Sequence, residues 1–451
     1  MRPQSVHAPR VKAGEISGLT VDSLTLDGEG VGKLAEREVF CRGVFPSEVA
    51  KVRIEAVSRH HPRAHARLIQ VTKKHAARRA APCPNHESRD GHCTGCTLME
   101  LSEDAQRDVK RSMLRERFGL EVAPIEPAAQ ALGYRFSSKR VAFGRRGFVY
   151  LGSFAHGSHA PAVMRGCLVD HPQLVRAFEL IENAVCELGI APYDEKSGQG
   201  DLRYVWAKTN GKDVIVTLIT AATETRVHEL VPLVGRELSG ILHSVQPSKG
   251  NAMRGSTSAL LHGQGEVSIQ LLAQRVEVGA LGFVQPNPAV AEQAYRALTE
   301  ELESTRDEAK PGKGELAFDL YAGTGVTTRV LAKRFTEVFA CEAHPESAAT
   351  LGIEPEGVES FLTRAVAHRG AQVPSLVIAN PPRKGLGVEV CRLLNELGAP
   401  DVRVMSCGPE ALASDLARLA DRYELVSLQA FDTLPQTPHI ELVAQLRLRD
   451  R

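Results

Sequence analysis

One stretch of the chain constrains its fold more than any other: ELAFDLYAGTGVTTRVLAKRF, residues 315–335. A short apolar run ends in a turn with two glycines, Gly323 and Gly325, and a helical pattern follows directly. From residue 281 onward, apolar runs alternate with helical segments, which is typical of a doubly wound α/β domain. We therefore predict a Rossmann-like α/β domain over residues 271–451, with its ligand bound at the carboxyl ends of the strands.

The next apolar run, VFACE, ends in Glu342. In nucleotide-binding domains, an acid at this place accepts hydrogen bonds from ribose hydroxyls, and the glycines let the backbone approach the ligand. The third glycine of the dinucleotide fingerprint is missing, because residue 328 is Thr. No pyrophosphate then has to be cradled, which favours S-adenosylmethionine over NAD. A purely structural tight turn is the alternative.

Residues 15–72 predict a small OB-like β-barrel. Alternating apolar positions are broken at short intervals by Asp-Gly, Gly-Glu-Gly and Phe-Pro-Ser turns, which suits five short strands. Residues 1–80 hold fifteen Lys and Arg against eight Asp and Glu, although the whole chain has a net charge of only +1. A locally basic unit of this kind favours a nucleic-acid partner, with an ordinary solvated surface as the alternative.

Residues 73–270 predict a mixed α/β central domain, with a helix at 101–118 capped by Ser102. Three domains fit a chain of 451 residues. No apolar run approaches the roughly 20 residues of a membrane helix. The polar N-terminus contains no apolar targeting segment. We expect a cytoplasmic, monomeric protein without membrane contacts.

The nine cysteines do not predict a disulfide framework, because their number is odd and no export signal is seen. Cys83, Cys93, Cys96 and Cys167 form a set of four thiols, which suits either a [4Fe–4S] cluster or a zinc site. Cys407 stands apart, since it follows an apolar run that begins at Asp401. Its thiol is therefore predicted at the carboxyl edge of the C-terminal sheet.

A thiol beside a methyl donor fits one chemistry in particular. Addition of a thiolate to C6 of a uracil ring makes C5 nucleophilic towards a methyl sulfonium, and a base must then remove the C5 proton. Glu441, in the sequence His-Ile-Glu near the C-terminus, is a credible base. The alternative for Glu441 is an ordinary exposed acid on a strand.

Several motifs now resemble one family in the same order along the chain. They are Phe-Val-Gln-Pro-Asn at 283–287, Asn-Pro-Pro-Arg-Lys-Gly at 380–385, Ser-Cys-Gly-Pro at 406–409, His-Ile-Glu at 439–441 and the four cysteines. The chain is similar to the S-adenosylmethionine-dependent RNA uracil-C5-methyltransferases. The most similar branch is the 23S ribosomal RNA type, with an N-terminal TRAM barrel and an iron–sulfur cluster. The resemblance extends from about residue 15 to the end of the chain.

The resemblance implies a class I methyltransferase domain in which Cys407 is the nucleophile and Glu441 is the base. It implies S-adenosylmethionine as a cofactor and a [4Fe–4S] cluster held by the four cysteines. The partner it implies is RNA, with 23S rRNA preferred and tRNA possible. The predicted cofactor-binding residues, from the motifs and the resemblance together, are Gln285, Tyr321, Gly323, Gly325, Glu342 and Asn380.

Some residues depart from the family's pattern. Asn380 and Gly408 stand where the family has Asp and Asn, and Val326 stands where it commonly has Asn. An Asn can hold a ligand but cannot act as a base. These departures leave two alternatives open: a relative that methylates poorly or elsewhere, and an RNA-binding iron–sulfur protein without catalysis. Retention of both Cys407 and Glu441 argues against the second.

Overall fold

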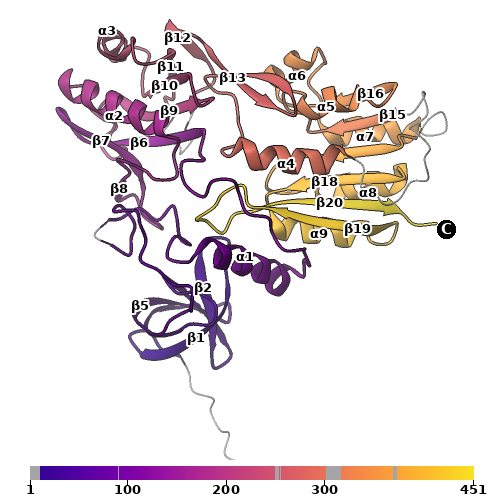
Figure 1. Cartoon of the computed structure of the whole chain (residues 1–451), viewed down its shortest axis with the longest axis horizontal. Coiled ribbons are helices and arrows are strands. Elements are labelled where there is room, and N and C mark those ends of the chain that lie inside the picture. Colours follow the sequence, from indigo (N-terminus) through magenta and orange to yellow (C-terminus); the bar gives the residue numbers. More distant parts are fainter. Residues whose placement is uncertain are drawn as a thin grey trace, which may run out of the picture.

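The computed structural model describes residues 11–89, 91–248, 253, 255–300, 316–368 and 373–450. A barrel at one end is followed by a helix, a central sheet and a C-terminal α/β domain (Figure 1). The first ten residues, part of the predicted polar N-terminus, lie outside the described residues, as does Glu315 of the Gly-rich stretch. The predicted boundaries at 72/73 and 270/271 remain a prediction.

The N-terminal strands form a closed barrel in the order β1-β2-β3-β5-β4. Their bounds are Ile16–Leu24 (β1), Glu29–Leu34 (β2), Arg37–Arg42 (β3), Val49–Val57 (β4) and Arg63–Lys73 (β5). Successive side chains of a strand point to opposite faces, so alternate residues such as Leu19, Val39 and Val52 fill the interior. The predicted five-stranded OB-like barrel is confirmed.

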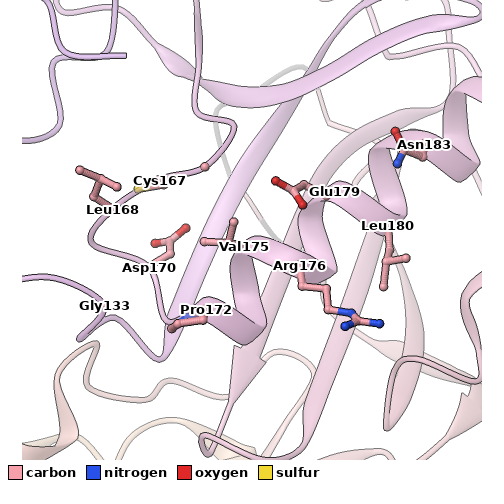
Figure 2. A pocket seen from close by; sticks show the side chains of 11 residues that line it. Gly133, Cys167, Leu168, Asp170, Pro172, Val175, Arg176, Glu179, Leu180 and Asn183 are labelled. Atoms are coloured by element: carbon pink, nitrogen blue, oxygen red, sulfur yellow. The ribbon is translucent and has the colours of Figure 1, made fainter. Parts of the chain in front are cut away.

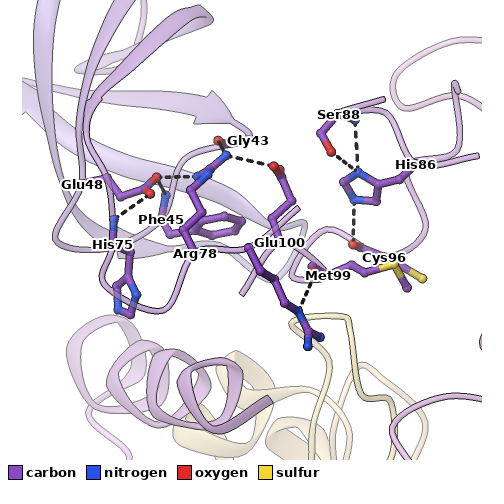
Figure 3. A network of polar contacts seen from close by, with 11 residues as sticks. Gly43, Phe45, Glu48, His75, Arg78, His86, Ser88, Cys96, Met99 and Glu100 are labelled. Atoms are coloured by element: carbon purple, nitrogen blue, oxygen red, sulfur yellow. Dashed lines mark hydrogen bonds and ion pairs between the residues drawn. The ribbon is translucent and has the colours of Figure 1, made fainter. Parts of the chain in front are cut away.

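The connector between β5 and α1, residues 74–102, is tied back to the barrel by a polar network (Figure 3). The Arg78 guanidinium pairs with Glu48 at 2.8 Å and Glu100 at 3.2 Å, and it donates to the Gly43 carbonyl at 3.0 Å. The Glu48 side chain is fully buried, so these bonds replace the water it has lost. Part of the connector's positive charge is therefore used inside the protein.

Helix α1 (Glu103–Phe118) confirms the helix predicted at 101–118. Ser102 caps its first turn by accepting from the Ala105 amide, and Gly119 ends it in the left-handed conformation at φ 67°. One face of α1 joins an apolar cluster with the barrel and the connector: Leu24, Phe45, Leu98, Leu101, Ala105 and Val109. Helix α1 thus anchors the barrel to the rest of the chain.

The central domain is a seven-stranded sheet in the order β12-β11-β10-β9-β6-β7-β8. Its strands are β6 (Ser137–Arg145), β7 (Phe148–Phe154), β8 (Pro161–Val163), β9 (Leu202–Thr209), β10 (Val214–Thr220), β11 (Gly240–Val245) and β12 (Ser258–Gly263). Helix α2 (Pro172–Glu187), the 3₁₀ turn η1 (Val227–Leu230) and the short α3 (Val231–Val234) share one apolar core with this sheet. The predicted mixed α/β architecture is confirmed.

A hairpin, β13 (Glu266–Leu271) and β14 (Gln274–Gly279), leads into the C-terminal domain. The domain is built on a six-stranded sheet in the order β16-β15-β17-β18-β20-β19. Its strands are β15 (Leu316–Leu320), β16 (Glu337–Cys341), β17 (Leu376–Ala379), β18 (Asp401–Ser406), β19 (Tyr423–Phe431) and β20 (Glu441–Leu448). Its helices are α4 (Pro288–Thr299), α5 (Val326–Leu331), α6 (Pro345–Leu351), α7 (Val358–Ala367), α8 (Gly387–Leu397) and α9 (Pro409–Leu419).

Strands β15 to β18 run parallel, whereas β20 pairs antiparallel with both β18 and β19. The carboxyl ends of the parallel strands therefore meet the start of β20 at one edge of the sheet. Among the described residues, no helix is long and apolar enough to cross a membrane.

Candidate active site

Cys407 lies between the end of β18 and the start of α9, and it is exposed. The residue after it, Gly408, donates its amide to the Ser406 hydroxyl at 3.2 Å. A Cβ at position 408 would lie 2.7 Å from the Arg383 carbonyl oxygen, so the backbones approach too closely for a larger residue. Packing against Arg383 explains why this chain has Gly408 beside the cysteine.

Cys407 lines a cavity of about 620 Å³ that four parts of the chain enclose. The loop after β17, the start of α9 and the segment before β20 form most of its wall, and the barrel contributes the turn between β1 and β2. The lining residues are Leu26, Asp27, Arg383, Lys384, Gly387, Val388, Cys407, Gly408, Glu410, Ala411, Ser414, Arg418 and His439. The cavity is thus rich in cationic side chains, with Asp27 and Glu410 as its acids.

Glu441 is the first residue of β20 and is only 6% exposed. The alternative of an ordinary exposed strand acid is therefore wrong. Burial raises the pKa of its carboxyl to about 7, because the charged form loses its hydration. A carboxyl with a pKa near neutrality is well matched to removing a proton at physiological pH.

Cys407 interacts electrostatically with Glu441 and Arg383, although the three residues come from separate parts of the chain: two loops and the start of β20. Partial removal from water raises the pKa of the Cys407 thiol, and the charge of Glu441 raises it further. Arg383 lowers this pKa through its charge and through a hydrogen bond to the sulfur. Arg383 thus favours the thiolate, together with a backbone hydrogen bond at Cys407 itself.

Glu342 and the glycine turn meet as the nucleotide-binding pattern predicts. The Glu342 carboxylate accepts from the Gly323 amide at 2.9 Å and from the His344 amide at 2.6 Å. Gly323 has φ 56°, and a Cβ there would meet no atom within 4 Å, so the backbone faces open space. Gly325 has φ 78°, a conformation that residues with a side chain rarely adopt, and a Cβ there would also meet the Leu351 side chain at 2.2 Å, so this position favours glycine.

Tyr321 also has a positive φ of 60°, which is uncommon for a residue with a side chain. Burial raises the pKa of its hydroxyl to about 12, and the charge of Glu359 adds to this shift. Tyr321 therefore lies in a strained turn between β15 and α5, next to the glycines, with Glu359 near its side chain. Strained residues of this kind cluster at functional sites.

Tyr295 of α4 connects the remaining predicted residues, and the sequence analysis missed it. Its hydroxyl forms hydrogen bonds with Gln285 and Asn380, and burial raises its pKa to about 12. The charges of Glu441 and Asp319 raise this pKa further. A buried tyrosine hydroxyl needs a partner, and the position of Tyr295 on the apolar face of α4 was the available signal.

Asp319, at the end of β15, was missed as well. It is 2% exposed and accepts hydrogen bonds from the Thr327 and Thr328 hydroxyls, at 2.7 and 2.5 Å. Burial raises the pKa of its carboxyl to about 6. Because both threonines lie in the first turn of α5, Asp319 fixes that helix against the strand that leads to Tyr321.

The four cysteines predicted as a set line one small cavity between the connector and the central domain. Burial raises the pKa of the Cys93, Cys96 and Cys167 thiols. The loop that carries Cys83, Cys93 and Cys96 is called the cysteine loop below. His86 holds it, because the His86 ring contacts the Cys96 carbonyl oxygen at 3.1 Å (Figure 3). In the described part of the chain, however, no three His, Cys, Asp or Glu side chains stand in the geometry of a metal site.

A second cavity, of about 730 Å³, runs along α2 in the central domain (Figure 2). Its wall includes Cys167, Asp170 and Glu179, and it contains none of the residues predicted for catalysis. It is larger than the Cys407 cavity, but neither the predicted nucleophile Cys407 nor the cation Arg383 lines it. The Cys407 cavity is therefore the candidate active site.

Comparison with known proteins gives relatives over almost the whole chain. The family described as tRNA (Uracil-5-)-methyltransferase matches residues 371–448, which include Asn380, Cys407 and Glu441. An uncharacterized RNA methyltransferase of Listeria monocytogenes is 27% identical and covers 98% of this chain and 99% of that relative. Another, of Caldanaerobacter subterraneus, is also 27% identical and covers 96% of this chain and 99% of that protein.

The fold has a solved counterpart as well. The tRNA (uracil-54, C5)-methyltransferase of Pyrococcus abyssi, in complex with S-adenosyl-L-homocysteine, has a TM-score of 0.74 at 22% identity. It covers 95% of this chain and 99% of its own. The predicted fold class, a class I methyltransferase domain behind an OB-like barrel and a mixed α/β domain, is thereby confirmed. The chain is similar to RNA methyltransferases over almost its whole length and, as its sequence predicts, resembles the RNA uracil-C5-methyltransferase family.

Proposed function

We propose that the protein transfers a methyl group from S-adenosylmethionine to C5 of a uridine in RNA, through a covalent bond between Cys407 and C6 of that uridine. One observation carries the proposal. The thiol of Cys407 and the guanidinium of Arg383 line one cavity, and the charge of the buried Glu441 carboxyl acts on that same thiol. A nucleophile, a group that favours its thiolate and a base are the three parts that this chemistry needs.

The reaction begins at the sulfur. The Cys407 thiolate adds to C6, forming the S–C6 bond and moving the electron pair of the C5=C6 double bond to C5. When bound, S-adenosylmethionine supplies the methyl group that C5 then takes up. Glu441 removes the remaining C5 proton, the C5=C6 double bond forms again, and the S–C6 bond breaks to return the thiolate.

The turn between β15 and α5 supports a cofactor site. Gly323 leaves backbone facing open space, and Glu342 lies beside it at the end of β16. Gln285 and Asn380 both bond the Tyr295 hydroxyl, and the charges of Glu441 and Asp319 act on that hydroxyl as well. These residues would hold S-adenosylmethionine, the methyl donor of the proposed reaction.

The target RNA we propose is 23S rRNA, on the evidence of the N-terminal barrel and the four gathered cysteines. Transfer RNA is the second candidate, because the solved counterpart of the fold acts on tRNA. Mass spectrometry of nucleosides from both RNA classes, taken from a deletion strain and its parent, decides between them. Loss of 5-methyluridine from tRNA alone contradicts the 23S proposal.

Two substitutions at the site should behave differently. Cys407→Ala should bind RNA and cofactor but form neither adduct nor product, because no nucleophile remains. Glu441→Gln should still add to the ring and accept the methyl group, then stall with the C5 proton in place. The measurement is a denaturing gel of protein mixed with RNA and methyl-labelled cofactor, in which only Glu441→Gln should retain a labelled protein–RNA band.

The control is Cys186→Ala, which removes a thiol distant from the cavity and should leave methyl transfer unchanged. RNA containing 5-fluorouridine should trap the wild-type protein in the same way, since fluorine cannot leave as a cation. Substantial turnover by Cys407→Ala, or no adduct on fluorinated RNA that is demonstrably bound, refutes the thiol mechanism.

We further propose that Cys83, Cys93, Cys96 and Cys167 hold a [4Fe–4S] cluster. The support is that four thiols, the usual ligand set of such a cluster, line one buried cavity. A cluster there would supply no chemistry to methyl transfer, which involves no net oxidation. Its place between connector and central domain indicates a structural role.

A further inference from the structure

The turn between β1 and β2 of the barrel forms part of the candidate active site. Leu26 and Asp27 line the same cavity as Cys407, although some 380 residues separate them in the chain. The charge of Asp27 raises the pKa of His439, against the larger effect of burial, which lowers it. The barrel therefore reaches the reacting centre and is more than a distant source of RNA affinity.

This turn is held rigidly by its own hydrogen bonds. The Thr25 amide donates to Glu29 at 2.9 Å, the Gly28 amide donates to Thr25 at 3.0 Å, and Arg42 donates to the Asp27 carbonyl at 3.3 Å. Its conformation is thus set before any ligand arrives.

The turn is also wedged against the cysteine loop. Gly28 has φ 79°, and a Cβ there would lie 2.2 Å from the hydroxyl of Thr97, which directly follows Cys96. Only glycine allows both this conformation and this contact. The cysteine loop therefore supports the part of the barrel that faces the cavity.

The carboxylate of Asp27 is free to meet a ligand. Asp27 is exposed, and none of the ion pairs between described residues joins it to Arg383, Lys384 or Arg418. Those cations suit the phosphates of an RNA chain. The carboxylate of Asp27, in contrast, repels phosphates. An ionised carboxylate only accepts hydrogen bonds, so the groups of an RNA that it can bind are the N–H groups of the bases and the 2′-hydroxyls of the riboses. Of these two kinds of donor, only the base N–H groups differ with the sequence.

We propose that the β1–β2 turn is a specificity element of this cavity, in which Asp27 accepts a hydrogen bond from a nucleobase N–H of the bound RNA. The inference rests on the proposed function, which places a uridine at Cys407. The N–H belongs either to N3 of that uridine or to a base beside it. In either case the barrel selects which uridine reaches the thiol.

The test compares the full-length wild type with Asp27→Ala, Asp27→Asn and the control Asp22→Ala, an exposed acid on β1. Unmodified 23S rRNA and tRNA transcripts serve as probes for affinity and for methyl transfer. Asp27→Ala should lower kcat/KM by roughly ten- to a hundredfold, the worth of one hydrogen bond to a charged group. For Asp27→Ala the loss should lie mainly in KM. Asp27→Asn should retain part of the activity, because its side-chain carbonyl can still accept a hydrogen bond. The control Asp22→Ala should match the wild type.

Modified RNAs then identify the donor. In one arm the target is N3-methyluridine, and in the other each neighbouring base is replaced by a purine without N–H groups. The replacement that removes the recognised donor should weaken binding to the wild type but not to Asp27→Ala. If Asp27 acted only through its negative charge, the Asp27→Ala substitution would instead change the affinity for every RNA by the same factor.

Two results overturn the inference: Asp27→Ala equals the wild type in affinity and kcat/KM, or every replacement affects both proteins equally. If the wild type methylates neither RNA class, the proposed function has failed. The inference is then decided by the RNA affinities alone, and equal affinities of Asp27→Ala and wild type overturn it.

Discussion

At the scale of single residues, burial sets the chemistry of Glu441. Its carboxyl has a pKa of about 7, raised by loss of hydration, and only the ionised form can take the C5 proton. Turnover should therefore fall about tenfold per pH unit as the pH drops below about 7. Single-turnover methyl transfer measured against pH checks this, with RNA affinity followed in parallel to separate binding from chemistry.

The same shift predicts how stability depends on pH. The folded state holds the Glu441 proton more tightly than the unfolded state, whose pKa lies near 4.5. The contribution of this proton to the stability of the folded state is therefore complete below about pH 4.5, and it is lost as the pH rises to about 7. Glu441→Gln should remove this dependence and unfold less readily above pH 7, by up to about 3 kcal/mol. The exposed Glu424→Gln should show no such gain, and an identical gain in both variants contradicts the assignment.

The residues of the site differ in how far the sequence predicted them. Cys407 and Glu441 follow from motif order, because a short motif at a strand end places its own side chain. Tyr295 and Asp27 do not, since their roles depend on partners far away in the chain: Gln285 and Asn380 for the first, the Cys407 cavity for the second. Such contacts arise from the tertiary structure and leave little trace in local patterns.

At the scale of elements, α1 holds the segment that leads to β20. The Lys110 ammonium is fully buried and pairs with Asp432 at 2.5 Å. It also donates to the carbonyls of Leu434 and His439, at 3.2 and 3.1 Å. Gln106 of the same helix donates its side-chain amide nitrogen to the Gln436 side-chain oxygen, and its own side-chain oxygen accepts from the Gln436 backbone amide. Helix α1 therefore positions the segment that carries His439 and ends at Glu441.

Lys110→Met should lower the free energy of unfolding by about 3–5 kcal/mol, because Asp432 would remain buried without its counter-charge. Urea denaturation measures this loss. The double variant with Asp432→Asn should lose less, since no isolated charge is left. The control Arg115→Met removes an exposed cation of α1 and should change stability by less than about 1 kcal/mol. Equal losses for Lys110→Met and Arg115→Met contradict this role of the pair.

The elements themselves were largely predictable. Alternating apolar residues indicated the barrel strands, and Ser102 with a polar-apolar pattern indicated α1. The order of the seven central strands was not predictable, because local patterns identify strands but do not show which strands become neighbours. From the sequence alone, Lys110 would be predicted as an ordinary exposed lysine, because its partner Asp432 lies 322 residues away in the chain.

At the scale of the whole molecule, the cysteine site lies where several parts of the protein meet. Cys83, Cys93 and Cys96 come from the connector and Cys167 from the central domain. Two residues after Cys96, the Leu98 amide donates to Gln436 of the C-terminal segment at 3.0 Å. A ligand held by the four thiols would therefore lock connector, central domain and C-terminal domain together.

The proposed cluster predicts a brown protein on anaerobic purification, with about four iron atoms per chain. Cys167→Ser should lose iron and lower the unfolding temperature, whereas Cys186→Ser, outside the site, should keep both. Because Thr97 beside Cys96 supports the barrel turn at the active site, Cys167→Ser should also weaken RNA binding. Cofactor binding should persist, since Glu342 and the glycine turn belong to a separate core. A colourless protein with about one zinc per chain would exclude the cluster, and an unaltered RNA affinity in Cys167→Ser would show that the cysteine site does not support the barrel.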